Sequence, residues 1–203
     1  MNALTAATNP TTRAARSQRL SQVTRAPHET LDALVKAKAA FDTLQGFGRF
    51  LSAQYLFQAE LAPFYNDERL TALFPGLPRR CRADQALADL SDLGMRPPVA
   101  VPGAPADLTV AEALGWIFVS EGSKLGAAFL YKRAEALGLC AEKGARHLAE
   151  PEGGRAAGWK AFVKTLDALS LSEAEERLAD AGALAAFTRF TVLLQAAYAD
   201  AQA

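Results

Sequence analysis

The sequence predicts an all-α protein built from one domain. Half of its 203 residues are apolar, and alanine, the strongest helix former, is very frequent. Apolar residues recur at helical spacing in several segments, and no segment shows a convincing strand pattern. The chain is long enough to bury one full core. We therefore expect a single domain over residues 11–203, preceded by a small, polar and flexible leader over residues 1–10.

The first half of the chain predicts four helices. Residues 12–35 carry apolar side chains at helical spacing, but Pro27 interrupts them. This helix therefore either kinks at Pro27 or restarts with Pro27 in its first turn. Residues 47–63 predict a second helix that is rich in aromatic side chains. Shorter helices are expected at 67–74 and 82–93.

A proline-rich connection separates these helices from a long one. Residues 94–107 contain four prolines and two glycines, which is typical of a surface connection. Thr109 and Glu112 then form a predicted capping box, which opens a helix that continues to Leu137. Gly138 is expected to terminate this helix.

Two further helices complete the predicted fold. A glycine-containing loop over residues 144–154 leads into a helix that carries Trp159 and Phe162. Ser172 and Glu175 have the spacing of a second capping box, and the helix that they open is expected to continue to about Tyr198. Every predicted element is thus helical.

Charge and composition narrow the function classes. Twenty-two basic residues balance twenty-two acidic ones, so the chain lacks the basic character of a nucleic-acid binder. Cys81 and Cys140 lie far apart without a metal-binding spacing, which fits a reducing compartment. No signal peptide and no apolar run of about 18 residues is visible. We therefore expect a cytoplasmic protein that binds neither membranes nor nucleic acids.

One of the two histidines, His28, lies on an otherwise apolar face of the first helix. A lone histidine there is more often structural than a ligand, but Leu20, Leu31 and Val35 share its side and can wall an apolar pocket. Haem iron is commonly held by one such histidine, whose other ring nitrogen is fixed by a neighbour. The nearby candidates for that neighbour are the carboxylates at positions 29 and 32. His147, in a loop, is expected to be a structural hydrogen-bonding residue.

Three glycines, Gly115, Gly122 and Gly126, fall on one stripe of the long helix. Each costs roughly 1 kcal/mol relative to alanine inside a helix. In a chain so rich in alanine, they indicate that something approaches the backbone more closely than a Cβ allows. This partner is either another tightly packed helix or a planar ligand. Together with His28, the stripe suggests haem covered closely on its second face.

No histidine accompanies these glycines. A peroxidase-like site needs a histidine there for acid–base cleavage of peroxide at the iron, and without it the peroxide can attack the macrocycle itself. Haem also carries two propionates, which require cations at the pocket mouth. The sequence offers several candidates, each of which is equally compatible with ordinary surface charge: Arg13, Arg16, Arg19, Lys36, Lys132 and Arg133.

Taken together, these segments resemble the bacterial, biliverdin-producing heme oxygenases, specifically the iron-acquisition type of Gram-negative bacteria. The resemblance runs from about residue 14 to the C-terminus, and its most specific stretch is LGWIFVSEGSKLGAAFL over residues 114–130. Matching stretches elsewhere are residues 17–20, 27–31, 53–58, 144–149 and 153–155. The resemblance implies a helical bundle with haem between a proximal and a distal helix.

The resemblance also implies the reaction and its partners. A heme oxygenase oxidises haem at one meso carbon, yielding biliverdin, carbon monoxide and ferrous iron. Haem is both cofactor and substrate, O2 is the oxidant, and electrons come from a separate reductase of the ferredoxin or flavoprotein type. The chain has no flavin or nicotinamide motif of its own, in agreement with this. We expect a monomer.

Site residues follow from the same resemblance. His28 matches the proximal iron ligand, and Gly122 and Gly126 match distal-helix glycines that contact haem and serve the reaction; Ser123 lies between them. Lys36 matches a propionate contact, and Arg133 replaces a lysine at another.

Two positions depart from a common pattern of the family. Ser21 stands where members carry lysine or asparagine, and Phe118 stands where some have tyrosine. Lysine and tyrosine at these two positions accompany α-cleavage in the family. Because Ser21 and Phe118 supply neither a cation nor a phenol, Lys36 and Arg133 are the expected anchors of the propionates. A rotated haem, cleaved mainly at the β and δ positions, is therefore expected.

Other functions remain open at this point. The main alternative is a non-catalytic haem carrier or storage protein that uses His28 without turnover. Thiamine-degrading enzymes and di-iron carboxylate proteins share helical architectures of this kind. A di-iron site is disfavoured because the sequence contains no Glu-x-x-His pair.

Overall fold

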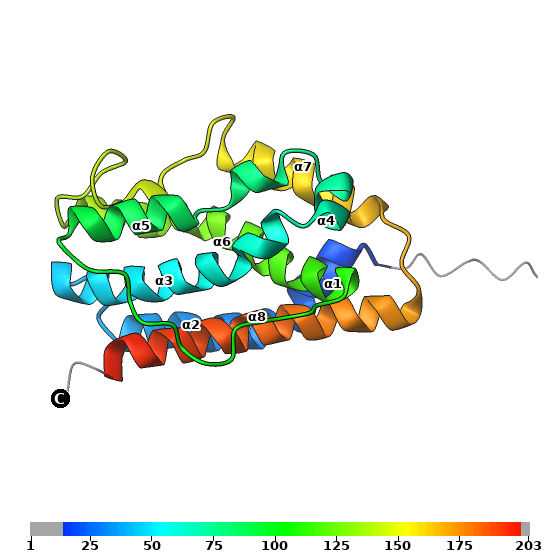
Figure 1. The fold of residues 1–203 in the computed structure, drawn as a ribbon, viewed down its shortest axis with the longest axis horizontal. Coiled ribbons are helices and arrows are strands. Elements are labelled where there is room, and N and C mark those ends of the chain that lie inside the picture. The colour runs from blue at the N-terminus through cyan, green and yellow to red at the C-terminus, as the bar shows by residue number, and fades with distance from the viewer. Residues whose placement is uncertain (1–13, 200–203) are drawn as a thin grey trace, which may run out of the picture.

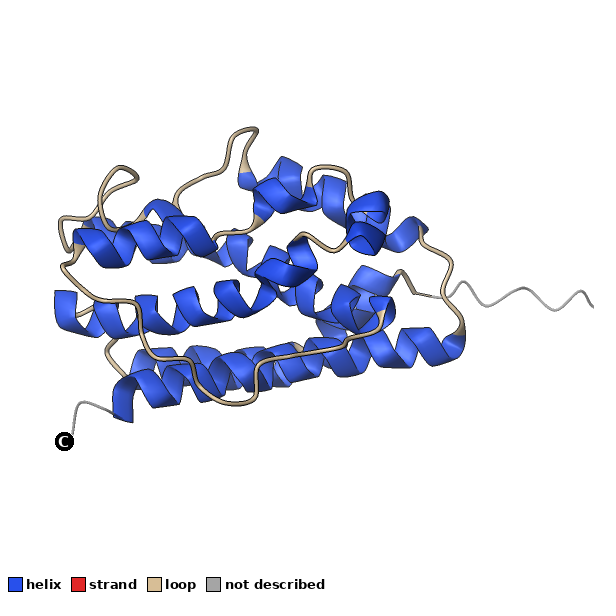
Figure 2. Ribbon diagram, viewed as in Figure 1, coloured by secondary structure: helices blue, strands red, loops and turns tan. Residues whose placement is uncertain are grey.

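The computed structural model describes residues 14–199, and these form helices joined by loops (Figures 1 and 2). The predicted leader and the candidate cation Arg13 lie outside the described residues. In the first half, the helices are α1 (Arg16–Val23), α2 (Arg25–Ala37), α3 (Leu44–Tyr65), α4 (Glu68–Leu73) and the short 3-10 helix η1 (Leu77–Arg80). In the second half, they are α5 (Ala83–Asp92), α6 (Val110–Glu135), the 3-10 helix η2 (Arg146–Leu148), α7 (Arg155–Ala168) and α8 (Glu173–Ala199).

The all-α prediction is confirmed, and the structure resolves the ambiguity at Pro27. The predicted first helix is two helices, because α1 ends at Val23 and α2 begins at Arg25. Pro27 lies in the first turn of α2, where a missing N–H disturbs no helical hydrogen bond. Thr24, at the junction, is buried, and its hydroxyl donates to the carbonyl of Leu20 at 2.7 Å.

The two predicted capping boxes are present. The Thr109 hydroxyl accepts from the backbone N–H of Glu112, whose carboxylate accepts from the N–H of Thr109 at 2.9 Å. Ser172 and Glu175 make the equivalent pair of bonds at the start of α8. Gly138, with a φ of 82°, follows α6 in the left-handed conformation that favours glycine.

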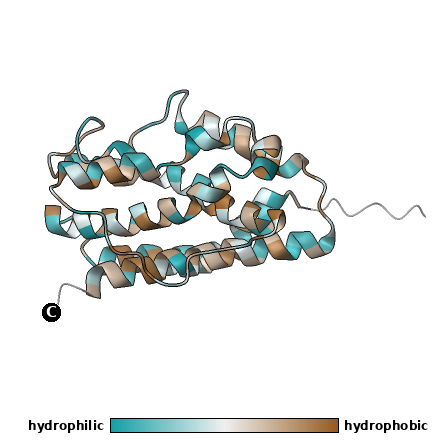
Figure 3. Ribbon diagram, viewed as in Figure 1, coloured by the Kyte–Doolittle hydropathy of each residue, from teal (hydrophilic) through white to brown (hydrophobic). Residues whose placement is uncertain are grey.

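The helices pack around a core to which α3, α6 and α8 all contribute, and α6 and α8 form the most extensive contact. Figure 3 shows hydrophobic and hydrophilic positions interspersed along each of these helices. At the α6–α8 contact, Gly115 lies against the backbone of Gly182, and a Cβ on Gly115 would collide with the carbonyl of Ala179. The expectation that Gly115 faces a ligand is therefore wrong, because a neighbouring helix occupies that position.

Largely buried ion pairs hold α1 against α8. Arg16 and Arg19 of α1 both pair with Glu176 of α8, and Arg19 also pairs with Asp180 at 2.9 Å. These two arginines, considered above as propionate anchors, are instead committed to holding α1 on α8. None of the described helices is long and apolar enough to span a membrane.

The proline-rich connection is held at the surface, as predicted. It runs from α5 to α6 across the outside of the bundle, near α8 (Figure 1). Arg189 of α8 donates to the carbonyl of Pro102 at 2.7 Å and to that of Val101 at 2.6 Å, while it pairs with Glu60 of α3.

Candidate functional site

An apolar cavity of about 450 Å³ lies between α2 and α6. This volume is within the usual range for small-molecule and cofactor sites. Its walls are mostly aliphatic and aromatic, and they come from α1, α2, α3, α6, α7 and α8. The cavity brings together most residues that the sequence predicted for the site: Ser21, His28, Phe118, Gly122, Ser123 and Gly126.

His28 forms part of the α2 wall. Its Nδ1 lies 3.4 Å from Oδ2 of Asp32, one turn further along α2, and its ring meets that of Phe187 edge-on at 5.8 Å. The His28 side chain is 62% exposed, and no described residue of α2 is buried. Because Nδ1 faces Asp32, Nε2 is the nitrogen that remains for a metal.

The opposite wall is the glycine-bearing face of α6. A Cβ on Gly126 would meet no heavy atom within 4 Å, and one on Gly122 would make only an ordinary contact with Trp159 at 3.6 Å. Protein packing therefore does not require glycine at either position, in contrast to Gly115. The bare backbone instead leaves a cradle that a Cβ would fill, and this shape fits a flat ligand lying across α6.

Other side chains complete this wall. Phe118 is buried and its ring packs against that of Trp159 at 5.4 Å. The Ser123 hydroxyl donates to the carbonyl of Ser120 at 2.8 Å. Ser21, across the cavity on α1, donates its hydroxyl to the carbonyl of Ser17 at 2.8 Å.

Lys36 and Arg133 do not line the cavity. Lys36 is exposed and directly follows the lining residue Val35. Arg133 pairs with Asp42 at 3.1 Å and lies over the ring of Phe41. Exposed pairs of this kind contribute only about 0–1 kcal/mol, so a ligand carboxylate can compete with Asp42 for Arg133.

The sequence reasoning did not assign several wall residues. Phe187 and Phe190 lie three positions apart on α8, and Trp159 comes from α7. The two phenylalanines had a usable signal, because a spacing of three places both on one side of a helix. Nothing in the sequence indicated that this side faces His28.

A buried charged network fixes the rotation of α6. Glu121 is completely buried, accepts a hydrogen bond from the Tyr65 hydroxyl at 2.8 Å, and pairs with Arg80 and Lys124. Burial alone would raise the pKa of Glu121, but the charges of Lys124 and Arg80 outweigh it and lower that pKa. Because Glu121 and Lys124 are held on one face of α6, Gly122 and Gly126 are presented to the cavity from another.

His147 is structural, as predicted. It is 7% exposed, and its Nδ1 lies 2.7 Å from Oδ2 of Asp89. Within residues 14–199, no group of three or more His, Cys, Asp or Glu side chains is arranged to hold a metal ion. The described residues therefore give no support to a di-iron site.

The site has one histidine on one wall of an apolar pocket and bare backbone on the facing wall. In a helical bundle, this arrangement is typical of proteins that enclose a flat, metal-bearing macrocycle. Comparison with known proteins identifies the family within this class. The family model described as heme oxygenase matches residues 14–196. The chain is 58% identical over 185 residues to heme oxygenase PigA of Pseudomonas aeruginosa, covering 91% of this chain and 93% of that protein.

A solved structure supports the same family. The crystal structure of NO- and CO-bound heme oxygenase from Neisseria meningitidis matches the fold with a TM-score of 0.88 and 36% identity, covering 92% of this chain and 93% of that one. The chain belongs to the heme oxygenase family. It is accordingly an oxidoreductase that degrades haem, which decides against the non-catalytic carrier.

Proposed function

We propose that this enzyme releases iron from haem, holds the haem iron through Nε2 of His28, and cleaves the macrocycle mainly at the β and δ meso positions. The observation that carries this proposal is the pairing of His28 with the cradle at Gly122 and Gly126 across one apolar cavity. Haem supplies the iron at which oxygen is reduced, and its own ring is the group that is oxidised.

On the α2 side, His28 would bind the haem iron, and Asp32 orients the imidazole of His28. The Asp32 carboxylate faces Nδ1 of His28, so it favours the tautomer that carries a proton on Nδ1. The lone pair of Nε2 would then be free to hold the haem iron, and the imidazole would be a stronger donor. The edge-on contact with the ring of Phe187 also limits rotation of the imidazole.

On the α6 side, the residues mainly exclude water and other molecules from the pocket. Gly122 and Gly126 allow the macrocycle to lie against the helix backbone, which leaves little space for water or for a large second substrate. The lining side chains of α6 are apolar except for Ser123. None of them is a histidine or carboxylate that could act as the acid–base group of a peroxidase, so the macrocycle itself is the nearest oxidisable group.

The position of cleavage depends on how haem is rotated in its plane. Ser21 offers no cation on the α1 side and Phe118 offers no phenol, while Lys36 and Arg133 follow cavity-lining segments of α2 and α6. Lys36 and Arg133 would hold the propionates of bound haem, and anchoring there would favour oxidation at the β and δ meso carbons.

The enzyme depends on a partner for electrons. We infer that a separate reductase of the ferredoxin or flavoprotein type supplies them, because the sequence has no flavin or nicotinamide motif. We place this reaction in the cytoplasm and assign it to a monomer. The two cysteines, both free thiols, are compatible with a reducing compartment.

A turnover experiment tests the proposal. The chain is loaded with one equivalent of haem and supplied in air with ascorbate or a reductase, with catalase present to remove free peroxide. We expect loss of the haem spectrum, appearance of biliverdin, and chromatographic separation of mainly the β and δ isomers. Haem that survives reduction in air would contradict turnover, and product that is almost entirely α would contradict the proposed rotation.

A further inference from the structure

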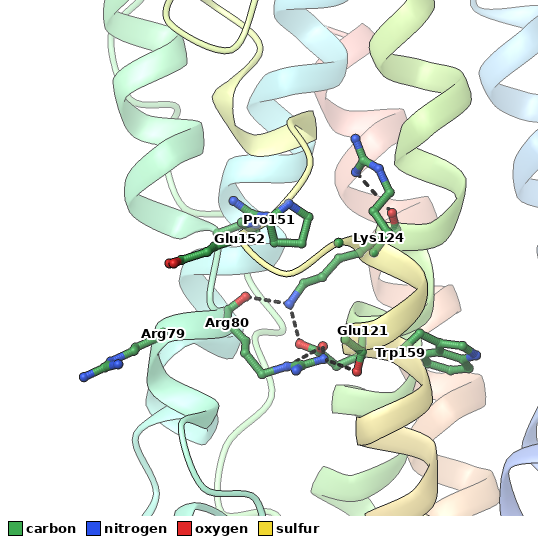
Figure 4. Close-up of a pocket in the computed structure, with 11 residues that line it drawn as sticks. Arg79, Arg80, Glu121, Lys124, Pro151, Glu152 and Trp159 are labelled. Carbon is green, nitrogen blue, oxygen red and sulfur yellow. Dashed lines mark hydrogen bonds and ion pairs between the residues drawn. The ribbon is translucent and has the colours of Figure 1, made fainter.

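A second cavity, of about 330 Å³, opens on a different face of α6 (Figure 4). We call it the basic cavity, because five cations and only two carboxylates line it: Arg79, Arg80, Arg82, Lys124, Arg155, Glu121 and Glu152. The cations come from η1, the start of α5, α6 and the start of α7. Three segments distant in the sequence, residues 79–82, Lys124 and Arg155, thus place positive charge in one hollow.

The carboxylates neutralise only part of this charge. Glu121 is used by Arg80 and Lys124, and Lys124 also donates to the carbonyl of Arg80 at 2.6 Å. Figure 4 shows this network at the centre of the cavity, with Arg79 and Glu152 extending away from it. Glu121 therefore has no capacity left for further cations.

Three lining cations remain: Arg79, which extends away from the network, and Arg82 and Arg155. Arg155 donates to the carbonyl of Leu148 at 2.7 Å, and Arg82 donates to that of Ala149 at 3.4 Å. Among the described residues, neither guanidinium is paired with a carboxylate. Burial, and next the charge of Arg155, lower the pKa of Arg82, and they outweigh the opposing effect of the Glu121 carboxylate.

The start of α7 adds to the positive potential. Its N-cap is Gly154, and the carboxylate of Glu150 accepts from the backbone N–H of Arg155 at 3.2 Å. Arg155 and Gly158 also line the cavity. The N-terminus of a helix carries partial positive charge and N–H groups without helical partners. A Cβ on Gly158 would approach the guanidinium of Arg80 only to 3.8 Å, so the hollow has room at this point.

We infer that the basic cavity binds a small oxyanion of the phosphate class, which takes charge-assisted hydrogen bonds from Arg82 and Arg155. Such an anion supplies the missing counter-charge, and guanidinium groups match its oxygens in geometry. The site is separate from the haem pocket, but Trp159 lines both cavities and α6 contributes to both. Trp159 can therefore report on the basic cavity by its emission.

Titration of the haem-free enzyme with inorganic phosphate tests this site without depending on turnover. Sodium phosphate replaces sodium chloride at constant ionic strength, while the thermal midpoint and the emission of Trp159 are followed in a Trp116→Phe background. We expect a saturable rise in the thermal midpoint and a change in emission that chloride does not produce. Arg155→Gln and Arg82→Gln should each weaken phosphate affinity by at least about tenfold.

Arg79→Gln is the matched control, because it removes the same charge from a side chain that extends away from the network. It should weaken phosphate affinity far less than Arg155→Gln or Arg82→Gln does. A response no greater for phosphate than for chloride, or equal affinity in the parent and in Arg155→Gln, would overturn the inference. If Arg155→Gln does not fold, phosphate binding is measured instead by phosphorus-31 line broadening in the parent and in Arg82→Gln. Equal broadening in these two proteins would overturn the inference.

Discussion

His28 and His147 are the only histidines of the chain, and they occupy opposite environments. His147 is buried and holds Asp89, whereas His28 is exposed beside the apolar cavity with only one ring nitrogen facing a carboxylate. A ligand histidine must keep a lone pair available, and the structure meets this condition at His28. The sequence supported the same choice, because His28 shares a helical face with apolar residues.

Replacement of His28 by alanine should abolish the Soret and visible bands of the ligated haem and stop biliverdin formation. Added imidazole should restore part of both, because it fills the space of the missing ring. Glu29→Gln is the matched control on the same helix and should leave the spectrum unchanged. Absorption spectroscopy of the haem-loaded variants measures this. An unaltered spectrum in His28→Ala would show that another group binds the iron.

The three glycines of α6 make a second test at the scale of single residues. Gly126→Ala and Gly122→Ala should each raise the free energy of unfolding of the haem-free enzyme by up to roughly 1 kcal/mol, because alanine is the better helix former and both sites have room. Both should weaken haem binding or turnover, because the new methyl group enters the cradle. Thermal melts without haem, paired with haem titrations, give the two quantities.

Gly115→Ala is the control for this experiment. Its methyl group would collide with the backbone of α8, so the variant should be destabilised even without haem. If Gly122→Ala and Gly126→Ala destabilise the haem-free enzyme as Gly115→Ala does, then all three glycines serve helix packing, and the cradle is not the reason for them.

At the scale of elements, Asp89 ties α5 to η2. Its carboxylate accepts from the backbone N–H groups of Arg146 and His147 at 3.0 and 2.9 Å, and it also contacts both side chains. Burial alone would raise the pKa of Asp89, but the hydrogen bonds from His147 and Arg146 outweigh burial and lower it. The ionised carboxylate is therefore the form that stabilises this junction.

Asp89→Asn should lower the free energy of unfolding at neutral pH by about 3 kcal/mol, because it breaks a buried, charged network. Since the folded pKa of Asp89 lies below its ordinary value of 3.8, its contribution is complete above that value and is lost as the pH falls through the folded pKa. Urea melts across this acid range should show a shallower pH dependence in Asp89→Asn. The exposed Asp84→Asn should match the parent, and an unchanged slope in Asp89→Asn would refute the assignment.

The sequence predicted helices far better than the contacts between them. Capping boxes at Thr109 and Ser172 are local, so they could be recognised in the chain and were confirmed in the structure. The pairing of Arg16 with Glu176 spans 160 residues, and nothing near Arg16 indicates it. The short helices η1 and η2 were also missed, because single turns carry too few residues to show a periodic pattern.

At the scale of the whole molecule, the cavity is an assembly of side chains from six helices. The sequence could place His28, Gly122 and Gly126 in one site, because each has an unusual residue type for its surroundings. It could not place Phe187 or Trp159 there, because an aromatic residue on a helix is an ordinary core residue until its neighbours are known. It could not foresee the contact of Gly115 with α8 for the same reason.

The orientation of haem depends on this whole assembly. The double variant Ser21→Lys and Phe118→Tyr should raise the fraction of α-biliverdin, because it gives the propionates a second set of anchors that competes with Lys36 and Arg133. Ser21→Ala, which adds no charge, is the control and should keep the isomer pattern of the parent. Chromatography of the biliverdin isomers measures the fractions, and an unchanged α fraction in the double variant would contradict the anchoring proposed above.

The central claim, that haem lies between α2 and the glycine face of α6, is tested most directly by a crystal structure of the enzyme with haem bound. We expect Nε2 of His28 to be the protein ligand of the iron, with the backbone at Gly122 and Gly126 in van der Waals contact with the opposite face of the ring. Lys36 and Arg133 should lie at the propionates. Haem bound through any other residue, or with its second face away from Gly122 and Gly126, would contradict this account.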